Sequence, residues 1–168
     1  MQRDEVDAVT RGQNGGEGTR ERGLLCRVGA ATCFVPLTHV VETMRPLPIR
    51  ALANAAPFVL GVAIVRGAAT MVVDAAMLLS APSSRTAPSR FVLLRVGRRA
   101  VALAVDEVVG IRDVTSASFV DLPPLLRAMS SDAVRAIGTL DQELTVVLQA
   151  AKLVLEDAWA AFEGEAAS

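Results

Sequence analysis

Apolar residues in this chain recur mainly with the two-residue period of β-strands. After the Gly29 turn, Cys33, Val35 and Leu37 lie two positions apart, and β-branched residues are frequent around them. Alternation of this kind is typical of half-buried strands rather than helices. The pattern therefore predicts a mainly β fold.

The strand pattern occurs twice. RVGAATCFVPLTHVVETM begins at Arg27, and RVGRRAVALAVDEVVGIRDV begins at Arg95, so that Gly29 aligns with Gly97. Glycine accepts the positive φ that tight hairpin turns require, and each Val-Gly step is therefore predicted to close a hairpin. Two similar β units follow, and we expect a binding scaffold that works through the groove or the edges between them.

A second pair of hairpins extends the repeat. Residues 59–65 and 70–73, turning at Arg66-Gly67, align with residues 136–140 and 144–148, turning at Asp141-Gln142. The two pairs of hairpins align at different offsets, so the connections between hairpins differ in length.

The repeat and the composition of its flanks predict the domain organisation. Residues 1–22 are charged and contain several glycines, which predicts a solvated tail. A single domain is expected over 23–163, with a Ser- and Pro-rich linker at 80–89 that separates a first unit (23–80) from a second (90–148). Residues 149–163 carry an apolar stripe at helical spacing, which predicts a helix packed on the β units.

Composition excludes several classes of function. The chain has 168 residues, 52% of them apolar, and a net charge of −1, so it can bury a core but offers no basic field for nucleic acid. Aromatic residues make up 4% and tyrosine is absent, which leaves few surfaces for base stacking. Arg66 and Asp74 interrupt the apolar stretch 51–79, so we expect no membrane insertion.

Residues suited to catalysis or metal binding do not form a recognisable constellation. His39 is the only histidine, and a surface or hydrogen-bonded role is favoured over that of a base. Cys26 and Cys33 are interpreted as reduced core residues, because no histidine or second cysteine pair accompanies them. No nucleophile elbow or phosphate loop is present. We therefore expect no enzyme activity, no metal and no cofactor.

Polar residues, prolines and glycines embedded in the strands identify a family. The segment VPLTHVVETMRPLPIRALANAAPFVLGVAIVRGAATMVVD, residues 35–74, resembles the CheW-like domain, the coupling module of bacterial chemotaxis. The family pattern I-P-L, V-x-E-V, a Pro-rich connection, G-V-x-N-L-R-G and P-V-x-D-L is matched by Val35, Pro36, Leu37, Val40, Glu42, Pro46, Pro48, Pro57, Gly61, Val62, Arg66, Gly67, Val72 and Asp74. In the second unit VALAVDEVV, residues 101–109, stands at the place of G-L-x-V-D-x-V, and the resemblance covers about residues 24–155.

This resemblance implies two five-stranded SH3-like β-barrel subdomains with a C-terminal helix, acting as a non-enzymatic adaptor. The implied partners are the regulatory domain of a CheA-type histidine kinase and the cytoplasmic tip of a chemoreceptor. The resemblance also implies that copies of the chain pair barrel to barrel and so self-associate in arrays. The implied location is the cytoplasm, with recruitment to membrane-associated receptor arrays.

Roles for individual residues are carried over from the family. Glu42 and Arg66 are implied to lie near the receptor-facing groove, with Val40 and Gly61 as further partner-binding residues. Two alternatives stay open: the charged pair interacts only with itself, and Val40 and Gly61 serve the core or a turn. Three further residues are interpreted as structural turn or cap residues, namely Gly67, Asp74 and Asp106.

Departures from the family pattern leave the choice of partner open. The family's Asn, Pro, Leu, Gly and late Asp are replaced by Ile64, Met71, Ala75, Ala102 and Gln149. These side chains suit strands, so we expect the fold to be kept. The alternative function is a divergent module that binds a different signalling partner, or a small ligand in the groove between barrels.

Overall fold

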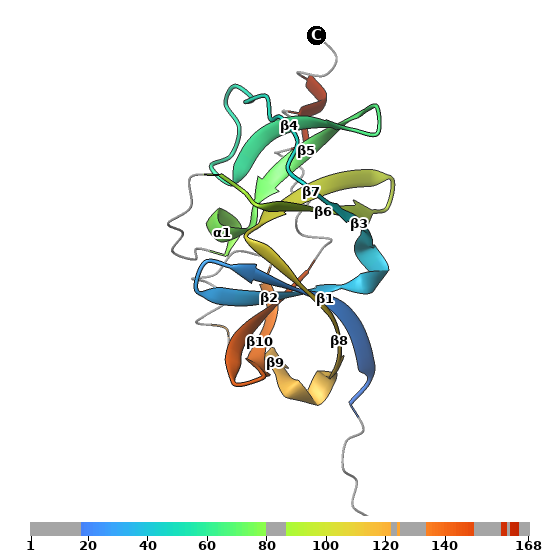
Figure 1. Ribbon diagram of the computed structural model, residues 1–168, viewed down its shortest axis with the longest axis vertical. Coiled ribbons are helices and arrows are strands. Elements are labelled where there is room, and N and C mark those ends of the chain that lie inside the picture. Colours follow the sequence, from blue (N-terminus) through green and yellow to red (C-terminus); the bar gives the residue numbers. More distant parts are fainter. Residues whose placement is uncertain are drawn as a thin grey trace, which may run out of the picture.

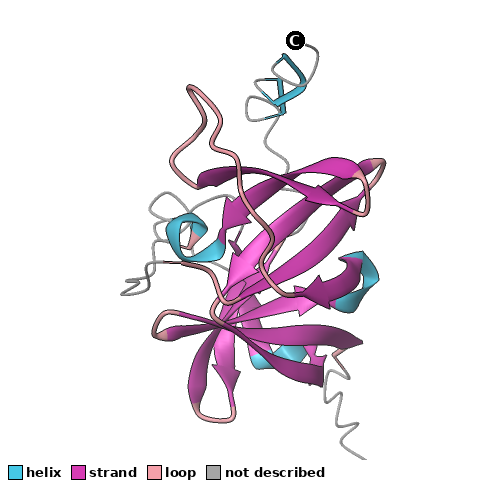
Figure 2. Cartoon of the chain, turned by 45° about the horizontal axis from the view of Figure 1, so that its top comes forward, coloured by secondary structure: helices cyan, strands magenta, loops and turns pink. Residues whose placement is uncertain are grey.

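The predicted β architecture is confirmed by the computed structural model, which describes residues 18–79, 87–121, 124, 134–149, 159–160 and 162–164. Two sheets lie one above the other (Figure 1), and helical segments are short in comparison with the strands (Figure 2). The upper, five-stranded sheet has the order β3 (Val40–Met44), β6 (Arg90–Val96), β7 (Arg99–Val105), β5 (Ala68–Asp74) and β4 (Val59–Val65). The lower, six-stranded sheet has the order β8 (Glu107–Thr115), β1 (Arg20–Val28), β2 (Ala31–Pro36), β11 (Glu143–Leu148), β10 (Val134–Leu140) and β9 (Phe119–Asp121).

All four predicted hairpins are present. Gly29 and Gly97 have φ of 58° and 62° and begin the two-residue turns of β1–β2 and β6–β7. Positive φ at the first turn residue is the geometry of a type II′ turn, which favours glycine there. The turns of β4–β5 and β10–β11 carry positive φ at both central residues, as in type I′ turns.

The two sheets exchange hairpins between the repeats. The β1–β2 hairpin joins the six-stranded sheet, where β2 runs parallel to β11, and the equivalent β6–β7 hairpin joins the five-stranded sheet, where β7 runs parallel to β5. Each sheet therefore contains strands from both sides of the predicted linker. This differs from the division into contiguous units 23–80 and 90–148, because β-sheet pairing joins strands that are distant in the sequence.

Equivalent edge strands carry equivalent bulges. Val41 is skipped where β3 pairs with β6, and Val109 is skipped where β8 pairs with β1. Their side chains are 48% and 37% exposed. A bulge bends an edge strand and re-aims a side chain, so both repeats present an apolar residue at the same place.

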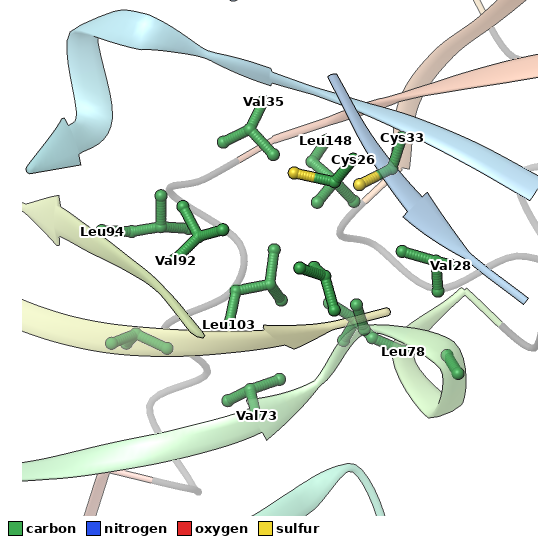
Figure 3. Packing of buried hydrophobic residues seen from close by; sticks show 14 of the residues in the cluster. Cys26, Val28, Cys33, Val35, Val73, Leu78, Val92, Leu94, Leu103 and Leu148 are labelled. Atoms are coloured by element: carbon green, nitrogen blue, oxygen red, sulfur yellow. The ribbon is translucent and has the colours of Figure 1, made fainter. Parts of the chain in front are cut away.

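Buried side chains form one central cluster and one smaller cluster within each sheet. The central cluster lies between the sheets and joins Cys26, Val28, Cys33 and Val35 of the lower sheet to Val73, Val92, Leu94 and Leu103 of the upper sheet (Figure 3). The five-stranded sheet encloses a second cluster around Phe91 and Ala102, and the six-stranded sheet encloses a third around Phe34 and Val147. The shared central core makes the two sheets one domain.

Short helical segments connect several strands. η1 (Leu37–His39) joins β2 to β3, η2 (Ser116–Ser118) joins β8 to β9, and α1 (Ala75–Leu78) follows β5. His39 therefore lies in a helical turn, and its Nδ1 is 3.3 Å from the carbonyl oxygen of Arg95.

The ends of the domain differ from the prediction in part. β1 begins at Arg20, inside the expected tail 1–22, because Glu21 and Arg22 pair with Val114 and Asp113 of β8. Residues 80–86 of the expected linker lie outside the described residues. Of the expected helix 149–163, Gln149 is not helical, whereas Trp159, Ala160, Phe162 and Glu163 are.

Trp159 anchors this C-terminal segment on the central core. Its side chain is buried beside Phe162, with ring centroids 5.1 Å apart in a T-shaped arrangement. The guanidinium carbon of Arg99 lies 5.0 Å from the indole centroid, and Arg99 also contacts Glu163 at 3.7 Å. The segment thus packs where β7 begins, and Trp159 is not an exposed anchor for a partner.

Candidate partner-binding site

Glu42 and Arg66, the two charged residues predicted to bind a partner, form a two-pronged ion pair. Arg66 donates from Nε to Oε1 of Glu42 at 2.5 Å and from Nη2 to Oε2 at 2.6 Å. Two parallel, charge-assisted hydrogen bonds fix both side chains in one relative orientation. The Arg66 side chain remains 76% exposed, whereas that of Glu42 is 25% exposed. Arg66 is therefore held in a defined orientation while most of its surface faces solvent.

The ion pair joins the two edges of the five-stranded sheet. Glu42 lies on β3 at one edge, and Arg66 lies in the turn that follows β4 at the other edge. The sheet must curl for these edges to come within hydrogen-bonding distance. The pair accordingly closes the sheet on itself, which is a structural role in addition to any contact with a partner.

Two exposed apolar residues lie on the strands that the ion pair joins. Val41 precedes Glu42 at the bulge of β3, and Ile64, two residues before Arg66 on β4, is 62% exposed. We call Val41, Glu42, Ile64 and Arg66 the β3–β4 seam. Exposed apolar side chains together with an exposed arginine are features of protein-binding surfaces, where arginine is enriched.

Val41, rather than Val40, supplies the exposed apolar surface. Val40 is half-buried against the central core and pairs with Leu94. The sequence contains a signal for this, because Val-Val at 40–41 recurs at 108–109 and interrupts the strand alternation in both repeats. Ile64 stands where the family pattern has asparagine, and the structure places that departure on the surface of the seam.

The ion pair lowers the pKa of Glu42. Hydrogen bonding from Arg66 is the main cause, the positive charge of Arg66 adds to it, and partial burial opposes it. A carboxylate with a lowered pKa stabilises the fold above its unfolded-state pKa, and that stabilisation is lost as pH falls through the folded-state pKa. The ion pair therefore stabilises the fold at neutral pH, and this stabilisation is lost in acid.

We expect Glu42→Gln to lower the urea midpoint of unfolding at about pH 6 and to have a shrinking effect as pH falls below 4.5, the ordinary pKa of the group. Urea titrations of both proteins across this range measure the difference. In an Arg66→Gln background the same substitution should have no such pH-dependent effect. A difference in urea midpoint that stays constant down to strongly acidic pH would contradict a stabilising ion pair between Glu42 and Arg66.

Gly61 is required for backbone packing rather than for an exposed contact. The backbone N–H groups of Arg50 and Val62 each donate to the other's carbonyl oxygen at 2.8 Å, which ties the connection after β3 to β4. Gly61 has φ of 143°, and a Cβ there would lie 2.1 Å from the carbonyl oxygen of Arg50. Only glycine allows the connection to lie this close.

Gly61→Ala should therefore reduce the free energy of unfolding by about 1–3 kcal/mol, because it adds a backbone clash to an unfavourable φ. Gly67→Ala is the matched control, since Gly67 has φ of 81° but a Cβ at this position would meet no atom within 4 Å. Thermal or urea unfolding of the two variants gives the comparison. Equal losses of unfolding free energy in the two variants would show that the clash between a Cβ at position 61 and Arg50 does not destabilise the fold.

The residues interpreted as structural lie at turns and caps. Gly67 completes the β4–β5 turn. Asp74 precedes α1, and its Oδ1 accepts a hydrogen bond from the backbone N–H of Ala76 at 2.9 Å. Asp106 accepts from the backbone N–H of Gly29 at 2.6 Å through Oδ2, and so connects the start of β8 to the β1–β2 turn.

Reactive groups are not gathered in the part of the chain that the structure describes. Within those residues no three His, Cys, Asp or Glu side chains lie close enough to hold a metal ion. Cys26 and Cys33 are opposed across β1 and β2 and are fully buried. A hydrogen bond of the Cys33 thiol with Cys26, together with burial, raises the pKa of Cys33 well above its ordinary value, which disfavours the nucleophilic thiolate.

Comparison with known proteins agrees with this fold. Residues 22–158 match the model of the CheW-like domain family, and the chain belongs to that family. Among solved structures it is similar to the scaffolding protein TtCheW from Thermoanaerobacter tengcongensis, with a TM-score of 0.68 and 16% sequence identity. That match covers 78% of this chain and 90% of the other. No curated protein sequence matches.

Helices that could cross a lipid bilayer are not found among the residues that the structure describes.

Proposed function

We propose that the chain is a non-catalytic adaptor that couples chemoreceptors to a CheA-type histidine kinase, with the β3–β4 seam as its receptor contact. Membership of the CheW-like family supports the adaptor role. The observation that carries the assignment of the surface is the two-pronged Glu42–Arg66 pair, whose arginine is 76% exposed and whose two strands, β3 and β4, each carry an exposed apolar residue.

The shared core suits an adaptor physically. A scaffold must hold two partners at a fixed separation, and this requires two surfaces on one rigid body. The central cluster packs both sheets against each other, so a partner on one sheet and a partner on the other would be held in a defined geometry. The exposed edge of β8, with Val109 37% and Ile111 54% exposed, offers apolar surface on the six-stranded sheet for the kinase.

Calorimetric titration of the full chain with the regulatory domain of a CheA-type kinase from the same organism tests this proposal. We expect saturable binding with a dissociation constant on the order of micromolar, as is usual for interfaces of signalling complexes. Ile111→Asp should weaken binding to the kinase domain. Val120→Asp is the matched control, because Val120 is also exposed, at 65%, but lies on β9, and this substitution should leave binding unchanged. Absence of binding to any such kinase would indicate that the fold has been kept for a different partner.

A further inference from the structure

Cys26 and Cys33 face each other in the central core. The register of β1 and β2 sets Cys26 directly opposite Cys33, so both side chains lie on the same face of the hairpin. Both are fully buried in the central cluster, and Figure 3 shows their sulfur atoms among its apolar side chains. The two thiols are hydrogen-bonded to each other. They are the chain's only cysteines, so each has the other as its one thiol neighbour.

The spacing of the two strands suits a disulfide bond at this position. Directly opposed residues of an antiparallel pair have Cα atoms about 4.5–5.5 Å apart, and disulfides usually join residues whose Cα atoms are about 4.4–6.8 Å apart. The strands are paired on both sides of the cysteines, from Gly23 opposite Pro36 to Val28 opposite Ala31. A bond between the two sulfur atoms can therefore form by side-chain rotation, with the strand pairing kept.

Access to the thiols depends on opening of β1. The hydrogen bond between the thiols and their burial raise the pKa of Cys33, so the reactive thiolate is disfavoured while the core is closed. The pairing of β1 with β8 shifts register between Leu25 and Cys26, where Val109 is skipped. A bulge of this kind interrupts the ladder of backbone hydrogen bonds. Local opening of β1 at the bulge therefore exposes the cysteines, and oxidation waits for that opening.

We propose that Cys26 and Cys33 form a reversible modification site, at which a low-molecular-weight disulfide such as oxidised glutathione converts the two thiols into one intramolecular disulfide. One thiol loses its proton and attacks a sulfur atom of the oxidant, which forms a mixed disulfide and releases one reduced glutathione. The other thiol then loses its proton and attacks the protein sulfur of the mixed disulfide, which releases the second reduced glutathione. The cysteine pair thus loses two electrons, and the oxidant gains them. This inference does not depend on the proposed coupling function.

Pairing of the cysteines decides which product of oxidation accumulates. A thiol held beside a mixed disulfide attacks it within the same molecule, and such a reaction is strongly favoured over attack by a second molecule. A cysteine without this neighbour keeps the glutathione adduct. The closed disulfide joins β1 to β2 and restricts the unfolded chain, so the oxidised protein should also be more stable than the reduced protein.

Incubation of the full chain with oxidised glutathione, followed by an acid quench and intact mass spectrometry, tests the proposal. We expect a product that is lighter by two hydrogen atoms, carries no glutathione and returns to its original mass with dithiothreitol. Peptide mapping should place the bond between Cys26 and Cys33. Cys33→Ala is the matched control, because it leaves Cys26 without its partner and should accumulate the glutathione adduct instead. The result for the wild-type chain does not depend on whether this variant folds.

Urea unfolding of the oxidised chain, followed by Trp159 fluorescence, shows whether the disulfide fits the native core. We expect a single transition at a higher urea concentration than in the reduced chain, with a return to the reduced midpoint after dithiothreitol. Wild-type thiols that stay unmodified over the time in which the urea-unfolded chain is completely oxidised overturn the proposal. So does a wild-type chain that accumulates the glutathione adduct, or a disulfide form that unfolds at a lower urea concentration than the reduced chain.

Discussion

Leu103→Ala is expected to lower the free energy of unfolding by about 2–5 kcal/mol, the range observed when a fully buried leucine is truncated. Leu103 lies on β7 with no exposed surface, in the central cluster that joins the two sheets. The substitution removes buried apolar contacts and leaves a cavity that the surrounding strands fill only in part. Because both sheets contribute to this cluster, we also expect them to unfold together, in a single transition at a lower urea concentration than in the wild type.

Urea unfolding followed by far-ultraviolet circular dichroism and by Trp159 fluorescence measures both effects. Leu144→Ala is the matched control, because Leu144 is also a strand leucine but is 59% exposed, and surface substitutions usually change stability by about 0.5 kcal/mol or less. Two separated transitions in Leu103→Ala would show that the sheets are independent units. A loss no larger than that of Leu144→Ala would contradict the central position of the cluster.

Arg66→Glu is expected to weaken binding to a chemoreceptor cytoplasmic fragment on the order of tenfold or more, while unfolding remains cooperative. The substitution places two carboxylates at the seam, removes the exposed guanidinium and breaks the closure between β3 and the β4–β5 turn. Fluorescence anisotropy of a labelled receptor fragment measures the affinity. Arg22→Glu is the matched control, because Arg22 forms an exposed ion pair with Asp113 on the other sheet, at 2.8 Å.

The double variant Glu42→Arg with Arg66→Glu separates two explanations. It restores an ion pair with reversed polarity, so stability should recover if the pair acts only in closing the sheet. Receptor binding should stay weak if the partner contacts the arginine directly at its native place. Recovery of receptor binding together with stability would reduce Arg66 to a structural role, and the seam would lose its proposed function.

Local sequence patterns predicted the hairpins well because each is determined by nearby residues. Gly29, Gly97 and the Arg66-Gly67 pair mark turns whose φ values few other residues accept, and alternation identifies the strands between them. Exchange of hairpins between the sheets could not be predicted from these signals. It depends on the parallel pairing of β2 with β11 and of β5 with β7, which joins segments far apart in sequence.

The geometry of the candidate site could be predicted only in part, because it too depends on how the strands pair. Glu42 and Arg66 were identified through the family pattern, and their contact follows from the curl of the sheet. Val41 was not singled out, because whether Val40 or Val41 faces solvent depends on a bulge in the pairing of β3 with β6. The start of β1 at Arg20 was missed because the charged residues at its partly exposed beginning resemble a tail.

The adaptor proposal is tested most directly by asking whether the chain binds both partners at once. A chemoreceptor cytoplasmic fragment and the regulatory domain of a CheA-type kinase are passed through size-exclusion chromatography with and without the full chain. We expect a ternary complex in which the receptor fragment and the kinase domain co-elute only when the chain is present, and in which Arg66→Glu releases the receptor fragment alone. If the chain binds each partner separately but never both together, or binds neither, it is not the adaptor proposed.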